Sequence, residues 1–470
     1  MKGDFSRSTF NERKHYSGVF MQQGRVQLDA DWNEEAQIVM HYLRSLARDI
    51  IGPHGGPKDN LGFEIGISKS SSLEFTIGGG HYYVDGILCE LENMVKYTAQ
   101  PDYPLTEDAK RVLQDANSTY LFYLDVWERH ITIVEDPSIL DVALGGPDTT
   151  TRAKVLCQVK TAKLQRGSDC SNMKPNWDRL LKEWQPKNRG QIKARAKRPS
   201  VSRLAEPNIT SPEACYSGSE NHLYRVEVHK PGSVKAASVG VRLGASSSSR
   251  RRSDGNPQSE DLTTAGTFRE RATFKWSRDN ASISFPIRKV ESSTLTLENM
   301  WRDDRFSLNE GDWVEVVNDD YALQNSAMDL ICVERIDPGN SEVKLNIDPN
   351  LSEHWEAKHP LLRRWDQKGD ANGIPIVEGT NTKFWLDLEE GVQIQFQPGG
   401  TYRTGDYWLI PARTTTGDVE WPGQVGKPSA QPPHGVEHHY APLSIISRKG
   451  KRIEKPHDCR VAFKNLNVRL

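Results

Sequence analysis

The densest group of potential metal ligands lies near the end of the chain. The segment His434-Gly-Val-Glu-His438-His439-Tyr440 combines imidazole and carboxylate groups, which suit zinc or iron. Prolines precede the segment and Gly435 interrupts it, so we do not expect a helix that presents two ligands on one face. The order also differs from H-E-x-x-H, in which a glutamate acts as base beside two helical ligands. We therefore expect no metal. If a metal site exists, His434, His438 and His439 are its candidate ligands; the alternative is that they are loop histidines that form hydrogen bonds with the backbone.

A second candidate site joins aromatic rings with charged side chains. Asp406, Arg413 and Asp418 flank Trp408 and Trp421 in one segment. Stacking on the rings and paired hydrogen bonds would suit a sugar ligand. Alternatively, an arginine–aspartate pair would hold a long loop over a tryptophan core, and we favour this interpretation because tryptophan is mostly buried. These five residues form the predicted ligand or docking loop.

Other reactive residue types lack the spacing that catalysis requires. The loop Asp148-Thr-Thr-Thr-Arg152 holds an acid, hydroxyls and a base, but hydrogen-bonded turns explain it more simply than an activated nucleophile. The chain contains no G-x-S-x-G elbow, no G-x-x-x-x-G-K-[ST] phosphate loop and no dinucleotide fingerprint. We expect no catalytic residue, no cofactor and no enzymatic activity.

The charge balance excludes partners that need a strongly charged surface. The 470 residues include 61 Lys and Arg against 63 Asp and Glu, a net charge of -2, so we expect no nucleic-acid partner. Apolar residues make up only 36%, yet there are 12 Trp, 14 Tyr and 13 Phe. The core should therefore rely on large aromatic side chains.

One helix is clearly written in the sequence, over Asp31–Ile51. Asp31 with Glu34 fits a capping box, and Gly52-Pro53 is a stop signal. Apolar residues recur in it with the 3-4 spacing of a heptad seam. This seam either packs on the protein's own core or joins copies of the chain about a symmetry axis. Its residues, the predicted oligomer interface, are Trp32, Ala36, Val39, Leu43, Leu46 and Ile50.

The rest of the pattern is mainly β, in small barrels or sandwiches, with α+β character at most in the first domain. Tyr120–Val134 is the strongest strand signal, and an Asp85-Gly86 turn predicts a hairpin. The length suggests roughly three domains. We expect a helix and β domain over 1–165, a polar and basic connecting region over 166–270 with a mobile insertion rich in Ser and Arg, and one or more β-rich domains over 271–470.

The remaining features concern the compartment. Six scattered cysteines without a C-x-x-C pair predict buried or incidental thiols rather than a disulfide framework. No stretch reaches the roughly 20 apolar residues of a membrane-spanning helix, and the first residues lack the apolar core of a secretory signal. We expect synthesis and assembly in the cytoplasm, without direct membrane insertion and with later release or attachment left open.

Several motifs, distinctive as a set, resemble a bacterial family with an uncharacterised domain. The N-terminal motifs are Lys2-Gly-Asp-Phe-Ser6 and the segment from Tyr16 to Glu34 that contains Gln-Gly-Arg and Asp-Trp-Asn-Glu. The further matches are Tyr83–Leu88, Tyr123–Arg129, Ala143–Thr149, Thr273–Arg278, Gly311–Glu315 and Gly405–Trp421. The resemblance covers most of the chain and is weakest over 165–220 and the insertion.

That family is associated with phage tail-like and contractile injection system gene clusters, and its opening is similar to that of phage baseplate and tail proteins. The resemblance implies a structural subunit, in the baseplate or at its periphery, whose partners are other subunits of the particle. It supplies no catalytic residue. A homo-oligomer is expected, with a trimer favoured. The alternatives are a glycan-binding or surface-binding fibre-like module and a metal-dependent hydrolase at the histidines.

Overall fold

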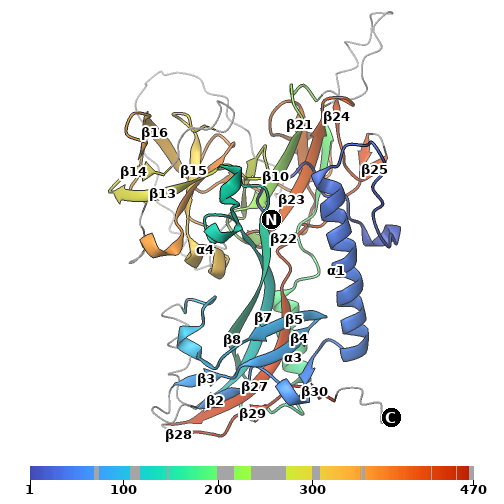
Figure 1. Cartoon of the computed structure of the whole chain (residues 1–470), viewed down its shortest axis with the longest axis vertical. Helices are drawn as coiled ribbons and strands as arrows, with labels where there is room; N and C mark the ends of the chain where they lie inside the picture. Colours follow the sequence, from blue (N-terminus) through green and yellow to red (C-terminus); the bar gives the residue numbers. More distant parts are fainter. Residues whose placement is uncertain are drawn as a thin grey trace, which may run out of the picture.

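The computed structural model describes residues 1–67, 74–105, 117–145, 148–197, 216–233, 271–298, 307–349, 351, 355–424, 426–450 and 452–464. The predicted Ser- and Arg-rich insertion lies almost entirely outside them. The fold is mainly β, as predicted, with the long helix α1 (Asp29–Ile51) along one side (Figure 1). Among the described residues, no helix is both long and apolar enough to cross a membrane.

The N-terminal β unit is built on the longest strands. β7 (Ser118–Ile131) pairs antiparallel with β8 (Arg152–Leu164) on one side and with β27 (His439–Lys449) on the other. Side chains on both faces of β7 are buried, because smaller sheets cover one face and α3 (Lys174–Trp184) packs on the other. The remaining strands of the unit are β1 (His54–Pro57), β2 (Ile65–Ile67), β3 (Phe75–Ile77), β4 (Gly80–Val84), β5 (Ile87–Leu91), β6 (Val95–Lys96), β28 (Arg452–Ile453), β29 (His457–Asp458) and β30 (Ala462–Phe463).

A sandwich of two sheets lies at the other end of the molecule, around one aromatic core that includes Phe274, Phe396 and Trp408. One sheet has the order β20-β21-β9 and the other β19-β12-β10-β23-β24. Their bounds are β9 (Ile192–Ala196), β10 (His222–Val228), β12 (Thr273–Ser277), β19 (Ile374–Pro375), β20 (Leu386–Asp387), β21 (Val392–Phe396), β23 (Tyr407–Arg413) and β24 (Asp418–Val419). Two short pairs are added by β11 (Gly232–Ser233) with β22 (Thr401–Tyr402) and β25 (Gly423–Gln424) with β26 (Lys427–Pro428).

A closed six-stranded barrel stands beside the sandwich (Figure 1). Alternate residues of its strands fill the interior, as small barrels require. Its strands in barrel order are β13 (Ser284–Glu291), β14 (Thr294–Leu297), β17 (Glu342–Leu345), β16 (Ile331–Asp337), β15 (Trp313–Val317) and β18 (Leu361–Trp365). The short helix α4 (Asp319–Gln324) follows β15, and the Asn318 side chain caps its start by accepting a hydrogen bond from the Tyr321 amide.

Sheet pairing joins segments that are distant in the chain. β27 lies between β7 on one side and β28 and β29 on the other, and β9 pairs with β21. Strands from both sides of the predicted divisions near residues 165 and 270 therefore share sheets. The divisions themselves stay a prediction. Nothing in the sequence pattern marked β27, because Pro442 interrupts its apolar run; the structure accommodates Pro442 at a register shift.

Two expectations about local chemistry were wrong. The predicted capping box of Asp31 with Glu34 does not form, because the helix already begins at Asp29 and its N-cap residue is Leu28, whose apolar side chain cannot accept a hydrogen bond. Glu34 accepts a hydrogen bond from Thr9 instead. The prediction of buried or incidental thiols holds for Cys89, Cys157 and Cys332, which are free, but Cys170 and Cys459 form a disulfide across 289 residues of sequence. Spacing could not reveal this pair, because α3 and the segment after β29 come together only in the folded chain.

Candidate functional site

Helix α1 is attached to the body of the molecule over a narrow strip. Only Ala30 and Ile38 are buried in it. Its C-terminal half is held by the ion pair Arg44–Glu128, at 2.8 Å, and by the β4–β5 hairpin. The predicted Asp85-Gly86 turn forms there, and a side chain on Gly86 would collide with the Arg44 carbonyl, so glycine permits this close approach.

The predicted heptad seam lies outside that strip. Its six residues, Trp32, Ala36, Val39, Leu43, Leu46 and Ile50, are all exposed. The interpretation in which the seam packs on the protein's own core therefore does not describe the single chain. The seam stays a predicted oligomer interface.

Exposed apolar side chains are concentrated around this helix. Nineteen large apolar residues are exposed in the described part of the chain, and twelve of them lie between Tyr16 and Ile50. Phe20 and Val26, in the segment before α1, are the most extreme of these at 90% and 85% exposed. Concentrations of this kind mark interaction sites in soluble proteins.

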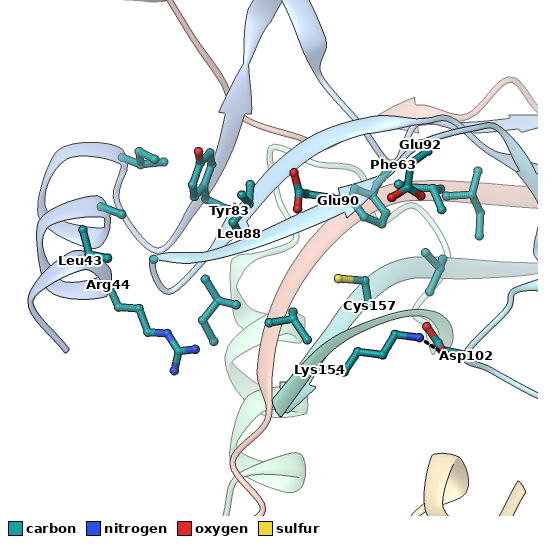
Figure 2. Close-up of a pocket in the computed structure, with 18 of the residues that line it drawn as sticks. Leu43, Arg44, Phe63, Tyr83, Leu88, Glu90, Glu92, Asp102, Lys154 and Cys157 are labelled. Atoms are coloured by element: carbon teal, nitrogen blue, oxygen red, sulfur yellow. Dashed lines mark hydrogen bonds and ion pairs between the residues drawn. The ribbon is translucent and has the colours of Figure 1, made fainter. Parts of the chain in front are cut away.

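The C-terminal half of the seam also forms one wall of a groove with a volume of about 1040 Å³ (Figure 2). Strands β5 and β8 form the other walls, and Leu88 and Cys157 line it with Leu43 of the helix. Charged groups stand around this apolar lining. Glu90 and Glu92 come from β5 and its end, while Lys154 and Asp102 are already paired at 2.9 Å. Glu90 lies 3.4 Å from His81 Nε2, so the groove is apolar inside with Glu92 as the unpaired acidic group at the end of β5, among the residues that the structure describes.

The segment before α1 runs along the helix before it projects. Phe10 reaches the ring of His41, and the Val19 amide donates to Glu35. From there the chain makes a turn closed by the Arg25 amide and the Gln22 carbonyl at 3.3 Å, with Gly24 at φ 70°. We call residues 19–28 the N-terminal arm. The sequence analysis did not predict this arm or the groove. The arm could have been found from its apolar residues, because their spacing fits neither a helix nor a strand.

The three candidate histidines are directed to separate partners. His438 Nδ1 lies 2.7 Å from Asp125, His439 Nδ1 lies 2.9 Å from Asp85, and His434 accepts a hydrogen bond from the Leu409 amide. No three His, Cys, Asp or Glu side chains gather as a potential metal site within the described residues. The histidines therefore act in this structure as separate hydrogen-bonding groups.

His438 shares the Asp125 carboxylate with Lys160 beside a polar pocket of about 360 Å³. Burial raises the pKa of Asp125, but His438 and Lys160 outweigh it and hold that pKa below its usual value. A carboxylate that orients a histidine is one part of a general-base dyad. Its two partners already satisfy it, so the arrangement equally serves to join β7, β8 and the start of β27.

The predicted tryptophan loop does not present an open aromatic platform. Trp408 is fully buried and donates to the Gln431 carbonyl, and Trp421 donates to the Ser429 carbonyl. Asp406 is buried and paired with Arg189 at 2.6 Å.

Arg413 forms an ion pair, but its acidic partner is neither of the two predicted aspartates. It pairs with Glu420 at 3.0 Å and also donates to the Ser6 carbonyl. Asp418 lies at the loop end in β24. The five residues are therefore gathered around one core, with little ring surface left for a ligand.

Comparison with known proteins adds a family and no function. The sequence model of DUF6519, described as a family of unknown function, matches residues 1–198 and residues 179–467. No curated protein and no solved structure matches the chain.

Proposed function

Because the chain belongs to DUF6519, a family of unknown function, we propose its role from its surface and from the motifs it resembles. It is a structural, non-enzymatic subunit of a phage-tail-like contractile injection particle, in the baseplate or at its periphery. It assembles with copies of itself, a trimer being favoured, and with other subunits of the particle.

One observation carries this proposal: the apolar seam of α1 is uncovered along its whole length. Trp32, Leu43, Leu46 and Ile50 are each more than half exposed. Exposed apolar surface on this scale is unfavourable in water. Each Å² of it that another chain covers lowers the free energy by about 25 cal/mol. Closed symmetry would satisfy every copy of the seam. The resemblance of the N-terminal motifs to phage-tail proteins supports the kind of assembly.

The two alternatives find less support. A glycan platform needs an open ring face, and Trp408 is buried. A metal-dependent hydrolase needs converging ligands, and His434, His438 and His439 bond elsewhere.

Light scattering after size-exclusion chromatography tests self-association of the full chain. We expect a mass of more than one chain, and the Leu43→Asp, Leu46→Asp double variant should run as a folded monomer. Negative-stain images of particles from cells with and without this chain test its place in the particle. A wild-type monomer at every concentration that never joins particles would sink the proposal.

A further inference from the structure

The groove beside α1 and the arm before α1 are complementary parts of one chain. The arm carries exposed apolar side chains, and Phe20 and Val26 are in contact with almost nothing in their own chain. The groove is concave and apolar, with a volume of about 1040 Å³. We propose that the N-terminal arm of one copy inserts into the groove of a second copy. This contact rests on the proposed self-association, and it assigns that association a specific pair of surfaces.

The arm cannot insert into the groove of its own chain in this conformation. It is attached at Glu35 by Val19 and continues directly into the helix at Asp29. The groove begins at Met40 and extends to Ile51 at the opposite end of the helix. From Asp29 to Leu46 the helix rises roughly 25 Å at about 1.5 Å per residue. Arm and groove of one chain therefore face different positions along the helix.

Charge favours the same pairing. The arm, residues 19–28, carries a single charged side chain, Arg25. The groove carries Glu90, which lies 3.4 Å from His81, and Glu92, which has no ion-pair partner among the residues that the structure describes. Insertion of the arm would bring a guanidinium group to a carboxylate beside an apolar wall, an arrangement that favours the correct register.

The amount of apolar surface is sufficient for a stable contact. Eight apolar residues that are each at least 40% exposed belong to the arm or to the helical wall of the groove, and together they offer on the order of 900 Å² per copy. They are Phe20, Met21, Val26 and Leu28 in the arm and Met40, Leu43, Leu46 and Ile50 on the wall. Stable interfaces bury about 800 Å² per partner. Because each copy supplies one arm and one groove, the contact closes as an exchanged pair or as a ring. In either case neighbouring α1 helices run antiparallel or staggered.

Cys157 on the groove wall provides a direct test. With Phe20→Cys in the full chain, mild oxidation should produce a disulfide between copies, seen as a covalent multimer on a non-reducing gel. The Phe20→Cys, Cys157→Ser double variant should return to monomer. Val142→Cys, at an 87% exposed position outside both surfaces, is the matched control and should give no such product.

Three results would overturn the inference: a cross-link that survives Cys157→Ser, a cross-link within one chain, or none while light scattering still shows an oligomer. In the third case the proposed self-association stands and only the arm–groove contact fails. A wild-type monomer at all concentrations would remove the proposed self-association and this contact with it, and if that monomer also never joins particles, the proposed function itself fails.

A second experiment measures the affinity. Phe20→Asp with Val26→Asp should weaken self-association by about 100-fold or more, because two large apolar side chains lose their burial. The thermal midpoint of the dissociated chain should not change, since both positions are exposed. Val142→Asp is the control. Arg25→Glu should also weaken association, and adding Glu92→Lys should restore it; equal Kd values in wild type and these variants would contradict the proposal.

Discussion

At the scale of single residues, the histidines show how burial changes chemistry that the sequence cannot specify. His229, at the end of the buried strand β10, is fully buried, and neither ring nitrogen has a hydrogen-bond partner in the described part of the chain. Burial, reinforced by Lys275, lowers the pKa of His229 to about 4. An exposed histidine titrates near 6.5.

This difference predicts a dependence of stability on pH. As the pH falls from 7 to 5, the unfolded chain binds a proton at His229 that the folded chain does not bind, so the free energy of unfolding should fall by about 2 kcal/mol from this residue. His229→Gln should remove that share. Urea denaturation of both proteins at pH 7 and pH 5 measures it, and identical pH dependences would refute the assignment.

At the scale of elements, α1 separates two kinds of apolar residue. Ile38 is 1% exposed against the body of the molecule, whereas Leu46 is 58% exposed on the seam. The hydrophobic period placed both on a helix, but it could not say which side the body would cover. The body contacts the helix at Ile38 and at Arg44, each directly beside a seam residue in sequence. Which side of the helix is covered depends on the β4–β5 hairpin and on Glu128, the partner of Arg44.

The two faces should respond differently to substitution. Ile38→Ala should lower the free energy of unfolding by about 2–5 kcal/mol, because it leaves a cavity. Leu46→Asp should change the stability of the monomer by less than about 0.5 kcal/mol and weaken self-association. Chemical denaturation and light scattering on the two variants check this. Equal destabilisation by both would mean that the seam is buried within one chain.

At the scale of the whole molecule, buried charges join the sandwich to the barrel. Lys275 of β12 pairs with Glu315 of β15 at 2.6 Å, and Glu315 also accepts from Trp365. Both charged side chains are nearly inaccessible to solvent. Burial raises the pKa of Glu315, but Lys275 together with Lys2 outweighs it and keeps the carboxylate ionised.

Removing one partner should therefore be costly. Lys275→Met should lower the free energy of unfolding by about 3–5 kcal/mol, because Glu315 remains buried without its lysine. The Lys275→Met, Glu315→Gln double variant should recover part of this loss. Urea denaturation tests both, and additive losses in the double variant would show that the two residues do not act as a pair.

The disulfide works at the same scale. It links the loop before α3 to the segment after β29. Under oxidising conditions, Cys170→Ser should lower the free energy of unfolding by about 2–5 kcal/mol relative to the wild type. Under reducing conditions the two proteins should be equally stable, because neither then has the disulfide. Thermal unfolding with and without dithiothreitol measures the difference. A reductant effect of equal size in both proteins would point to other thiols.

Local pattern was enough to predict the mainly β class, the long helix, its stop at Gly52 and the hairpin turn at Asp85-Gly86. These features follow from backbone preferences and side-chain periods over a few residues. Local pattern could not predict the pairing of segments that are distant in the sequence. Examples are β27 with β7, Cys170 with Cys459, and Lys275 with Glu315. The same holds for the candidate site. The heptad spacing predicted an apolar stripe, whereas the packing of β5, β8 and the arm around α1 left that stripe uncovered and formed a groove beside it, because exposure depends on which distant segments happen to meet there.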